Sequence, residues 1–132
     1  MTRREYYAPD RSSGWLRCHF RHHAHDDPLI LPGIQDLTAW VDFTSVARAA
    51  AAQGFDVAGY TPQAQFLMGG GLESEMRGFE ARATAEQLAL SQEIKKLTLP
   101  GEMGERFMCI ALLKGSIGTP TAFNLADRTH TL

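Results

Sequence analysis

The run RFMCIALLKG at residues 106–115 restricts the fold most, because it is the most apolar segment of the chain. Its apolar side chains would lie on both faces of an extended strand, which is typical of an inner strand of an α/β sheet. The run is too short to span a bilayer. We therefore predict a strand here that needs neighbours and cover on each face.

Three shorter extended segments accompany this strand. WLRCHFR at 15–21 alternates in polarity and places Cys18 on the face predicted to be buried. The segment HHAHDDP that follows is predicted to be a loop, because Pro28 and Pro32 exclude a helix. The other two extended segments are LTAWVDF at 37–43 and FDVAGY at 55–60.

A helix through SVARAAAAQ is predicted between the second and third of these segments. Thr44 is suited to cap its start, and Asp42 is a second residue of capping type just before it. Gly54 is predicted to end the helix, because glycine adopts the left-handed conformation that closes many helices.

Two further helical regions follow the strand at 55–60. Thr61 and Pro62 are predicted to be the N-cap and first residue of the helix QAQFLM, which ends at Gly69–Gly71. Residues 72–97 form the second region, divided by a predicted capping box at Thr84 and Gln87. Strands that alternate with helices indicate an α/β fold.

Composition excludes several classes of protein. A chain of 132 residues is enough for one core, and its net charge of −2 gives no basic field for nucleic acid. No apolar segment resembles a signal peptide or a membrane span. Cys18 and Cys109 are predicted to be free thiols in a reducing compartment, so we expect a cytoplasmic protein.

Four of the five histidines, His19, His22, His23 and His25, lie within seven residues and precede Asp26 and Asp27. Imidazoles and carboxylates at such short spacing could bind zinc or iron. Against a metal site, a strand and a proline-bounded loop do not fix three ligands on one face as a helical H-x-x-x-H does. We therefore favour a polar wall and predict no metal.

The junction of strand and helix at Tyr60, Thr61 and Gln63 is a second candidate site. Such junctions line the ligand crevice of open α/β sheets. Thr61 and Pro62 are already explained as a helix entry, so a structural role is favoured for them. Gln63 is kept as a candidate for the wall of a substrate cleft.

Five segments occur in the order and at the spacings of one family: HFRHHAHDDP, PGIQDLTAWVDF, GYTPQAQFL, LPGEMGERFMCIALLKG and DRTHTL. The sequence resembles the MidA-type class I S-adenosylmethionine-dependent methyltransferases from Arg4 to Leu132. That family includes the mitochondrial complex I assembly methyltransferase, which modifies arginine on a subunit of that complex. The part that this chain resembles is the C-terminal portion of such enzymes.

The resemblance implies that S-adenosylmethionine binds elsewhere in the family's chain, at a glycine-rich loop after a strand. The glycine cluster here, Gly69–Gly71, follows a helix and is predicted to be a helix end. We therefore expect the C-terminal part of a Rossmann-like class I methyltransferase fold, lacking the cofactor-binding half. Its divisions would be a polar lead-in at 1–14, an α/β portion at 15–115 and a tail at 116–132.

For function, the resemblance implies methyl transfer to a protein, with arginine as the expected acceptor. His22, His25, Asp26 and Asp27 would then face the cleft for the guanidinium group, which carboxylates can orient in a bidentate pair. No residue is assigned as catalytic, and no cofactor is expected to bind this chain alone. We also expect self-association through unpaired sheet edges, but neither a nucleic-acid nor a membrane partner. The alternatives are a stand-alone protein-binding module without catalysis and a non-functional gene fragment.

Overall fold

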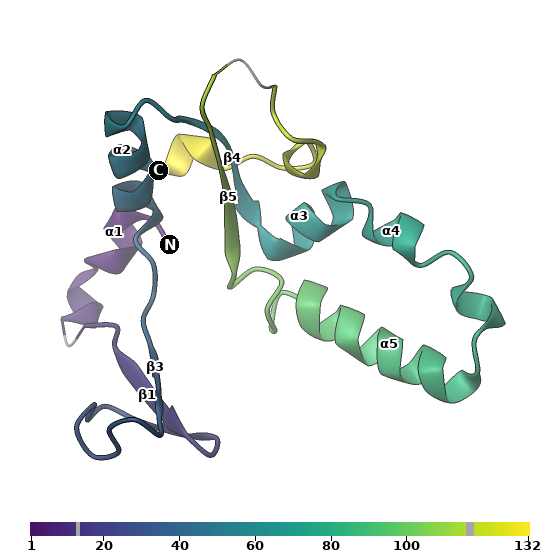
Figure 1. Cartoon of the computed structure of the whole chain (residues 1–132), viewed down its shortest axis with the longest axis horizontal. Coiled ribbons are helices and arrows are strands. Elements are labelled where there is room, and N and C mark those ends of the chain that lie inside the picture. Colours follow the sequence, from purple (N-terminus) through teal and green to yellow (C-terminus); the bar gives the residue numbers. More distant parts are fainter. Residues whose placement is uncertain (13, 116–117) are drawn as a thin grey trace. The chain divides into compact units, whose positions relative to one another are not determined.

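The computed structural model describes residues 1–12, 14–115 and 118–132 (Figure 1). The chain divides into two compact units, unit 1 at Met1–Val46 and unit 2 at Ala47–Leu132. Helix α2, Phe43–Ala52, carries the chain from one to the other. Helices and short strands make up both units, so the prediction of an α/β protein is confirmed at this level.

Unit 1 contains a three-stranded antiparallel sheet in the order β2-β1-β3. The strands are β1 at Arg17–Phe20, β2 at His23–His25 and β3 at Asp36–Thr38. The prediction of a loop over HHAHDDP is wrong for its first half, because His23–His25 form strand β2. This strand pairs with β1 through a turn at Arg21 and His22. Both turn residues have positive φ, 47° and 67°, as a tight two-residue hairpin requires.

The N-terminus of unit 1 holds a short helix within the predicted lead-in. Helix α1, Arg3–Tyr6, begins with a capping box in which Thr2 and Glu5 bond each other's backbone N–H. A 3₁₀ turn follows at Pro9–Arg11. The N-terminal amine donates to the Val41 carbonyl at 3.1 Å, and Phe43 N–H donates to the Met1 carbonyl at 3.0 Å. These bonds engage residues 41–43, so the strand predicted at 37–43 ends early, at Thr38.

Helix α2 is capped by Asp42, one of the two residues predicted to cap it. The Asp42 carboxylate accepts hydrogen bonds from Ser45 N–H at 3.1 Å and from the Ser45 hydroxyl at 2.6 Å. Thr44 is not the cap, because its hydroxyl accepts a hydrogen bond from Arg3 N–H instead. Gly54 follows the helix with a φ of 75°, as predicted for a helix end.

Unit 2 is built on two antiparallel strands, β4 at Asp56–Pro62 and β5 at Met108–Leu113, which lie side by side in Figure 1. The strand predicted from RFMCIALLKG is therefore confirmed. Between the two strands the chain forms α3, α4, a 3₁₀ turn and the long helix α5; their bounds are Gln63–Gly69, Leu72–Glu75, Phe79–Ala81 and Thr84–Thr98. The tail adds 3₁₀ turns η3 at Thr121–Phe123 and η4 at Thr129–Thr131.

Two predicted caps in unit 2 are wrong. Thr61 belongs to β4, and α3 begins one residue after Pro62 rather than at it. Thr84 and Gln87 form no capping box, since α5 has Ala83 at its N-cap without a side-chain bond. The Gln87 amide instead donates to carbonyls of the preceding turn, those of Phe79, Glu80 and Arg82.

Strand β4 is the centre of unit 2, because it has partners on both edges. β5 lies along one edge. On the other edge, Tyr60 N–H donates to Asp127 Oδ1 at 3.2 Å and the Tyr60 carbonyl accepts from Arg128 N–H at 2.7 Å. Hydrogen bonds from the Thr129 hydroxyl and from the backbone of Thr129 and Tyr60 lower the pKa of Asp127. The last four residues of β4, Gly59–Pro62, are all buried.

Gly59 lets the tail approach β4 closely. A Cβ on this residue would lie 2.4 Å from the Phe123 ring and 2.7 Å from the Phe123 Cβ. Phe123 is buried and also packs edge-on against Phe66 of α3, with ring centroids 5.3 Å apart. The absence of a side chain at Gly59 is therefore what allows η3 and α3 to cover this face of β4.

Gly59→Ala is expected to destabilise the chain by about 1–3 kcal/mol, because the new methyl group forces Phe123 away from the strand. Chemical denaturation followed by circular dichroism measures this change. Gly101→Ala is the matched control, since nothing lies within 4 Å of a Cβ at that position. Equal stability of the two variants would contradict the close packing of η3 on β4.

Candidate functional site

The five candidate residues fall in different units. His22, His25, Asp26 and Asp27 lie on or directly after the β1–β2 hairpin of unit 1. Gln63 is the first residue of α3 in unit 2. The structure therefore gathers four of them along one short segment, and Gln63 is described separately.

One face of the unit 1 sheet is polar. The register pairs Arg17 with Thr38 and His19 with Asp36 across β1 and β3. The Arg17 guanidinium forms an ion pair with Asp26, and both side chains are largely exposed. Thr38 Oγ1 lies 3.4 Å from His19 Nδ1 and donates to the Arg17 carbonyl at 3.2 Å. This polar face consists of Arg17, His19, Asp26 and Thr38. On it, the Arg17 guanidinium is already paired with the Asp26 carboxylate.

Asp26 and Asp27 differ in what they do locally. Asp27 Oδ1 accepts a hydrogen bond from Leu29 N–H at 2.9 Å, which closes a turn. Asp26 has no backbone bond of this kind among the described residues, and its partner is the exposed Arg17. Exposed ion pairs contribute little stability, so Asp26 can exchange Arg17 for another cation at low cost.

The opposite face of the sheet places His25 beside Cys18. The two are direct cross-strand partners, and Leu37 of β3 pairs with Cys18 on its other side. Cys18 is fully buried, and both His25 ring nitrogens are inaccessible to solvent without a hydrogen-bond partner among the described residues. His22, by contrast, is exposed in the hairpin turn. His22 and His25 therefore lie in different environments.

The described residues contain no group of three or more His, Cys, Asp or Glu side chains that could hold a metal ion. Extended backbone spreads the imidazoles over both faces of the hairpin, because neighbouring residues point to opposite sides. The predicted absence of a metal stays a prediction.

Gln63 has a structural task in unit 2. Its side-chain amide donates to the Leu97 carbonyl at 2.9 Å, and its backbone N–H donates to the Phe107 carbonyl at 2.8 Å. These bonds tie the start of α3 to the end of α5 and to the residue before β5. The Gln63 side chain is therefore already used within unit 2.

The glycine cluster Gly69–Gly71 is a helix end, as predicted. Gly69 ends α3, and Gly71, with a φ of 99°, precedes α4. A phosphate or cofactor loop of the Rossmann type runs from a strand through glycines into a helix. Within the described residues β4 enters α3 directly through Pro62, without glycine. These residues therefore do not fit the glycine-rich turn that would hold S-adenosylmethionine in a Rossmann-type fold.

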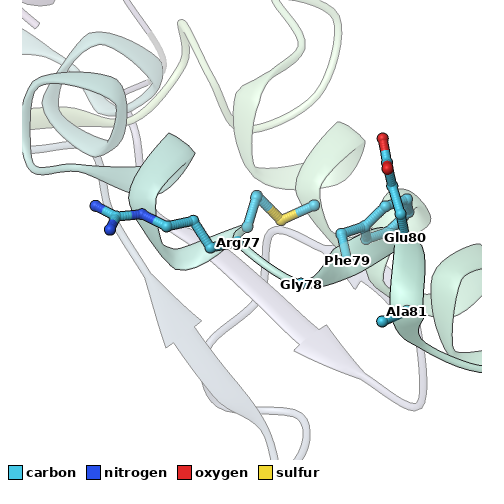
Figure 2. A pocket seen from close by; sticks show the side chains of 6 residues that line it. Arg77, Gly78, Phe79, Glu80 and Ala81 are labelled. Atoms are coloured by element: carbon cyan, nitrogen blue, oxygen red, sulfur yellow. The ribbon is translucent and has the colours of Figure 1, made fainter.

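A hollow of about 570 Å³ lies at the segment that connects α4 to α5 (Figure 2). It is lined by six consecutive residues, Met76–Ala81, and none of the predicted site residues contributes to it. Figure 2 shows the Arg77 side chain extending away from the Glu80 carboxylate, so the two charges do not converge on one point. The sequence carries no signal for this hollow, and its walls offer no catalytic arrangement.

Comparisons with known proteins agree on one family. A family profile described as S-adenosyl-L-methionine-dependent methyltransferase matches residues 1–61. A Drosophila melanogaster protein, the mitochondrial protein arginine methyltransferase NDUFAF7 homolog, is 36% identical over 98 residues, which are 73% of this chain and 22% of that protein.

Two crystal structures from Burkholderia thailandensis match this chain over its whole length. Both are of the COG1565 superfamily, with 38% and 39% identity and a TM-score of 0.89 in each case. One of them is bound to S-adenosyl-homocysteine. This chain covers 34% and 35% of the respective chains.

Fold, motifs and relatives all point to the methyltransferases that use S-adenosylmethionine. The comparisons support a MidA-type S-adenosylmethionine-dependent methyltransferase. The chain spans about a fifth of the length of the curated relative and about a third of the solved structures.

The cross-strand pair of Cys18 and His25 leads to a prediction about thiol reactivity. Cys18 is fully buried, whereas Cys109 on β5 is half-buried and burial raises the pKa of its thiol. In Cys109→Ser, alkylation of Cys18 by iodoacetamide is expected to be at least tenfold slower in the folded chain than in urea. The Cys18→Ala variant gives the matching rate for Cys109, and mass spectrometry reads both. Equal rates for Cys18 with and without urea would show that the sheet does not cover this thiol.

Proposed function

We propose that this chain is the acceptor-side part of a methyltransferase that transfers a methyl group to a protein, with an arginine guanidinium as the acceptor. Support comes from the 36% identity to an arginine methyltransferase homolog. The likeness over the whole chain to a structure bound to S-adenosyl-homocysteine supports the same class of reaction. The observation within the chain that carries the proposal is the exposed pair of Arg17 and Asp26.

Asp26 is the residue proposed to orient the acceptor. A carboxylate takes a guanidinium through charge-assisted hydrogen bonds and fixes its plane, which positions one nitrogen for reaction. Arg17 occupies this carboxylate in the described structure. A substrate arginine would replace Arg17 without leaving either charge buried, since both side chains are exposed.

The neighbouring candidates have supporting roles in this proposal. Asp27 holds the turn after β2 through Leu29 N–H, and so sets the position of Asp26. His22 presents an exposed imidazole at the hairpin turn, and His25 anchors β2 beside Cys18. Gln63 is assigned the placement of α3 rather than contact with substrate, because its amide is bonded to Leu97.

The cofactor would be held by the rest of a MidA-type chain. The described residues do not form a glycine-rich strand-to-helix turn, so we assign no step at the cofactor to them. S-adenosylmethionine supplies the methyl group for the family, and the chain alone is proposed to be inactive. We place the protein in the cytoplasm on the strength of its two free thiols. The described helices include none long and apolar enough to cross a membrane.

The rival proposal is a binding module that uses the polar face of unit 1 to hold a protein without chemistry. The exposed ion pair supports either role, because it presents a carboxylate to any basic partner. Transfer of a methyl group is the observation that separates the two. A gene fragment without function would show neither binding nor transfer.

The test is a chimera in which this chain replaces the matching third of the Burkholderia thailandensis protein that binds S-adenosyl-homocysteine. The probe is a Gly-Arg-Gly peptide with radiolabelled S-adenosylmethionine. Asp26→Asn is expected to raise the KM for peptide about tenfold, because a charged hydrogen bond is lost. Affinity for S-adenosyl-homocysteine, measured by calorimetry, is expected to stay unchanged.

Asp10→Asn is the matched control, because Asp10 is also an exposed aspartate paired with its own arginine, Arg11. That variant is expected to leave the KM for peptide unchanged. An equal rise in both variants would remove Asp26 from the proposed site. Peptide binding without any transfer of label would favour the binding module.

A further inference from the structure

The two tryptophans of the chain, Trp15 and Trp40, continue the polar face of unit 1. Arg17 pairs with Thr38 across β1 and β3, so the same spacing two residues further along places Trp15 opposite Trp40. The two ring centroids are 5.6 Å apart in an edge-to-face arrangement, as expected for side chains that face each other across a strand pair. Side chains two residues apart on extended backbone point to the same side. The two indoles therefore lie beside Arg17 and Thr38, on the side of the sheet that carries Asp26.

Neighbouring aromatic rings in unit 1 already hold guanidinium groups. The Arg11 guanidinium lies 4.5 Å from the ring centroid of Trp15, and the Arg3 guanidinium lies 5.5 Å from that of Tyr7. Tyr6 contacts both rings, with its centroid 6.1 Å from that of Trp15 and 5.1 Å from that of Tyr7. A cation within about 6 Å of a ring centroid is attracted by the negative face of the ring. The chain's own arginines therefore show which chemistry these rings attract.

Trp40 differs from Trp15 and Tyr7, because no arginine or lysine of the described residues lies over its ring. Trp40 is also 42% exposed. The Trp15 indole N–H donates to the Tyr6 carbonyl at 2.9 Å, which fixes the ring against which Trp40 packs. Trp40 therefore presents an aromatic surface that is held in place on one side and open to a ligand on another.

We infer that Trp40 is a stacking site for a second arginine side chain of the substrate protein. This inference rests on the proposed function, in which the first arginine takes the Asp26 carboxylate. Asp26 and Trp40 flank β1 on opposite sides and differ by one pair of residues along it, so their backbones are about 12 Å apart. An extended peptide spans this distance in about three or four residues. The substrate class is therefore a protein segment with two arginines at about that spacing.

Arginine suits this position better than lysine. A planar guanidinium group stacks on an indole and is weakly hydrated, whereas the lysine ammonium is compact and strongly hydrated. The arginine over Trp15 already has partners of its own. Arg11 Nε lies 3.8 Å from the Asp10 carboxylate, and its guanidinium donates to the Glu5 carbonyl at 2.8 Å. These partners offset the charge of Arg11, so a second guanidinium at Trp40 meets less repulsion.

The test uses the peptide Gly-Arg-Gly-Gly-Arg-Gly and a matched peptide in which leucine replaces the second arginine. Calorimetry measures the Kd of each peptide for the unmodified chain and for Trp40→Leu. The variant is expected to bind the two-arginine peptide about two- to fivefold more weakly, which is the size of a cation–π contact at an exposed site. Its Kd for the leucine peptide is expected to be unchanged, because the variant keeps an apolar side chain.

Intrinsic fluorescence is an independent readout, because Trp15 and Trp40 are the only two tryptophans of the chain. The two-arginine peptide is expected to change the emission of the unmodified chain. Trp40→Phe retains a ring and is expected to keep part of the affinity that Trp40→Leu loses. Leu37→Ala is the matched control, since Leu37 is 56% exposed on the opposite face of β3, and is expected to leave both Kd values unchanged. Thermal melting checks that each variant folds.

Three results would overturn the stacking site. Equal weakening of both peptides in Trp40→Leu would show that Trp40 makes an apolar contact and does not select arginine. An unchanged Kd for the two-arginine peptide in this variant would show that Trp40 takes no part in binding. The same conclusion follows if the unmodified chain does not bind that peptide.

Asp26→Asn separates this inference from the proposed function. It is expected to weaken both peptides, because both carry the first arginine. Weaker binding in Trp40→Leu but not in Asp26→Asn would support the stacking site and contradict Asp26 as the acceptor carboxylate. Weaker binding in Asp26→Asn but not in Trp40→Leu would overturn the stacking site and leave the proposed function intact.

Discussion

The backbone hydrogen bonds on both edges of β4 are the interactions on which unit 2 depends. Tyr60 bonds the tail through Asp127 and Arg128, and this fixes which way the paired residues from Gly59 to Pro62 of β4 and from Met108 to Ala111 of β5 direct their backbone groups. The tail can reach the strand because Gly59 has no side chain to keep Phe123 away. Burying a backbone N–H or carbonyl without a partner is costly, so β4 can be buried only because both edges are paired. β5 does not meet that condition within the described residues of unit 2.

The functional proposal rests on surfaces whose groups are still available to a partner. Unit 1 presents a polar face on which Arg17 pairs with Asp26. In unit 2, the described residues leave one edge of the apolar strand β5 without a paired strand. A methyltransferase needs an acceptor positioned next to its cofactor. The proposed function assigns the carboxylate for the acceptor to Asp26 of this chain and the cofactor to the rest of a MidA-type chain. The family relationship and the short span relative to its members are consistent with that division of roles.

Features encoded by local sequence were predictable, and features that depend on distant residues were not. The apolar run at β5, the glycine ends of α2 and α3 and the cap at Asp42 each have a local signal. The β1–β2 hairpin was missed because Arg21 and His22 adopt positive φ without the glycine or asparagine typical of such turns. The bond between Tyr60 and Asp127 spans 67 residues and leaves no local pattern. For the same reason, the pairing of Arg17 with Asp26 could be seen only once the hairpin register was known.

Amide hydrogen exchange along β5 in the isolated chain tests the central claim most directly. The account predicts that the amides of Cys109 and Ala111, which bond toward β4, exchange at least tenfold more slowly than those of Ile110 and Leu112. The two classes are neighbours in sequence and share the same half-buried strand, so exposure to solvent alone does not separate them. Equal protection of all four amides would contradict the account, because it would show that the outer edge of β5 already has a partner within this chain.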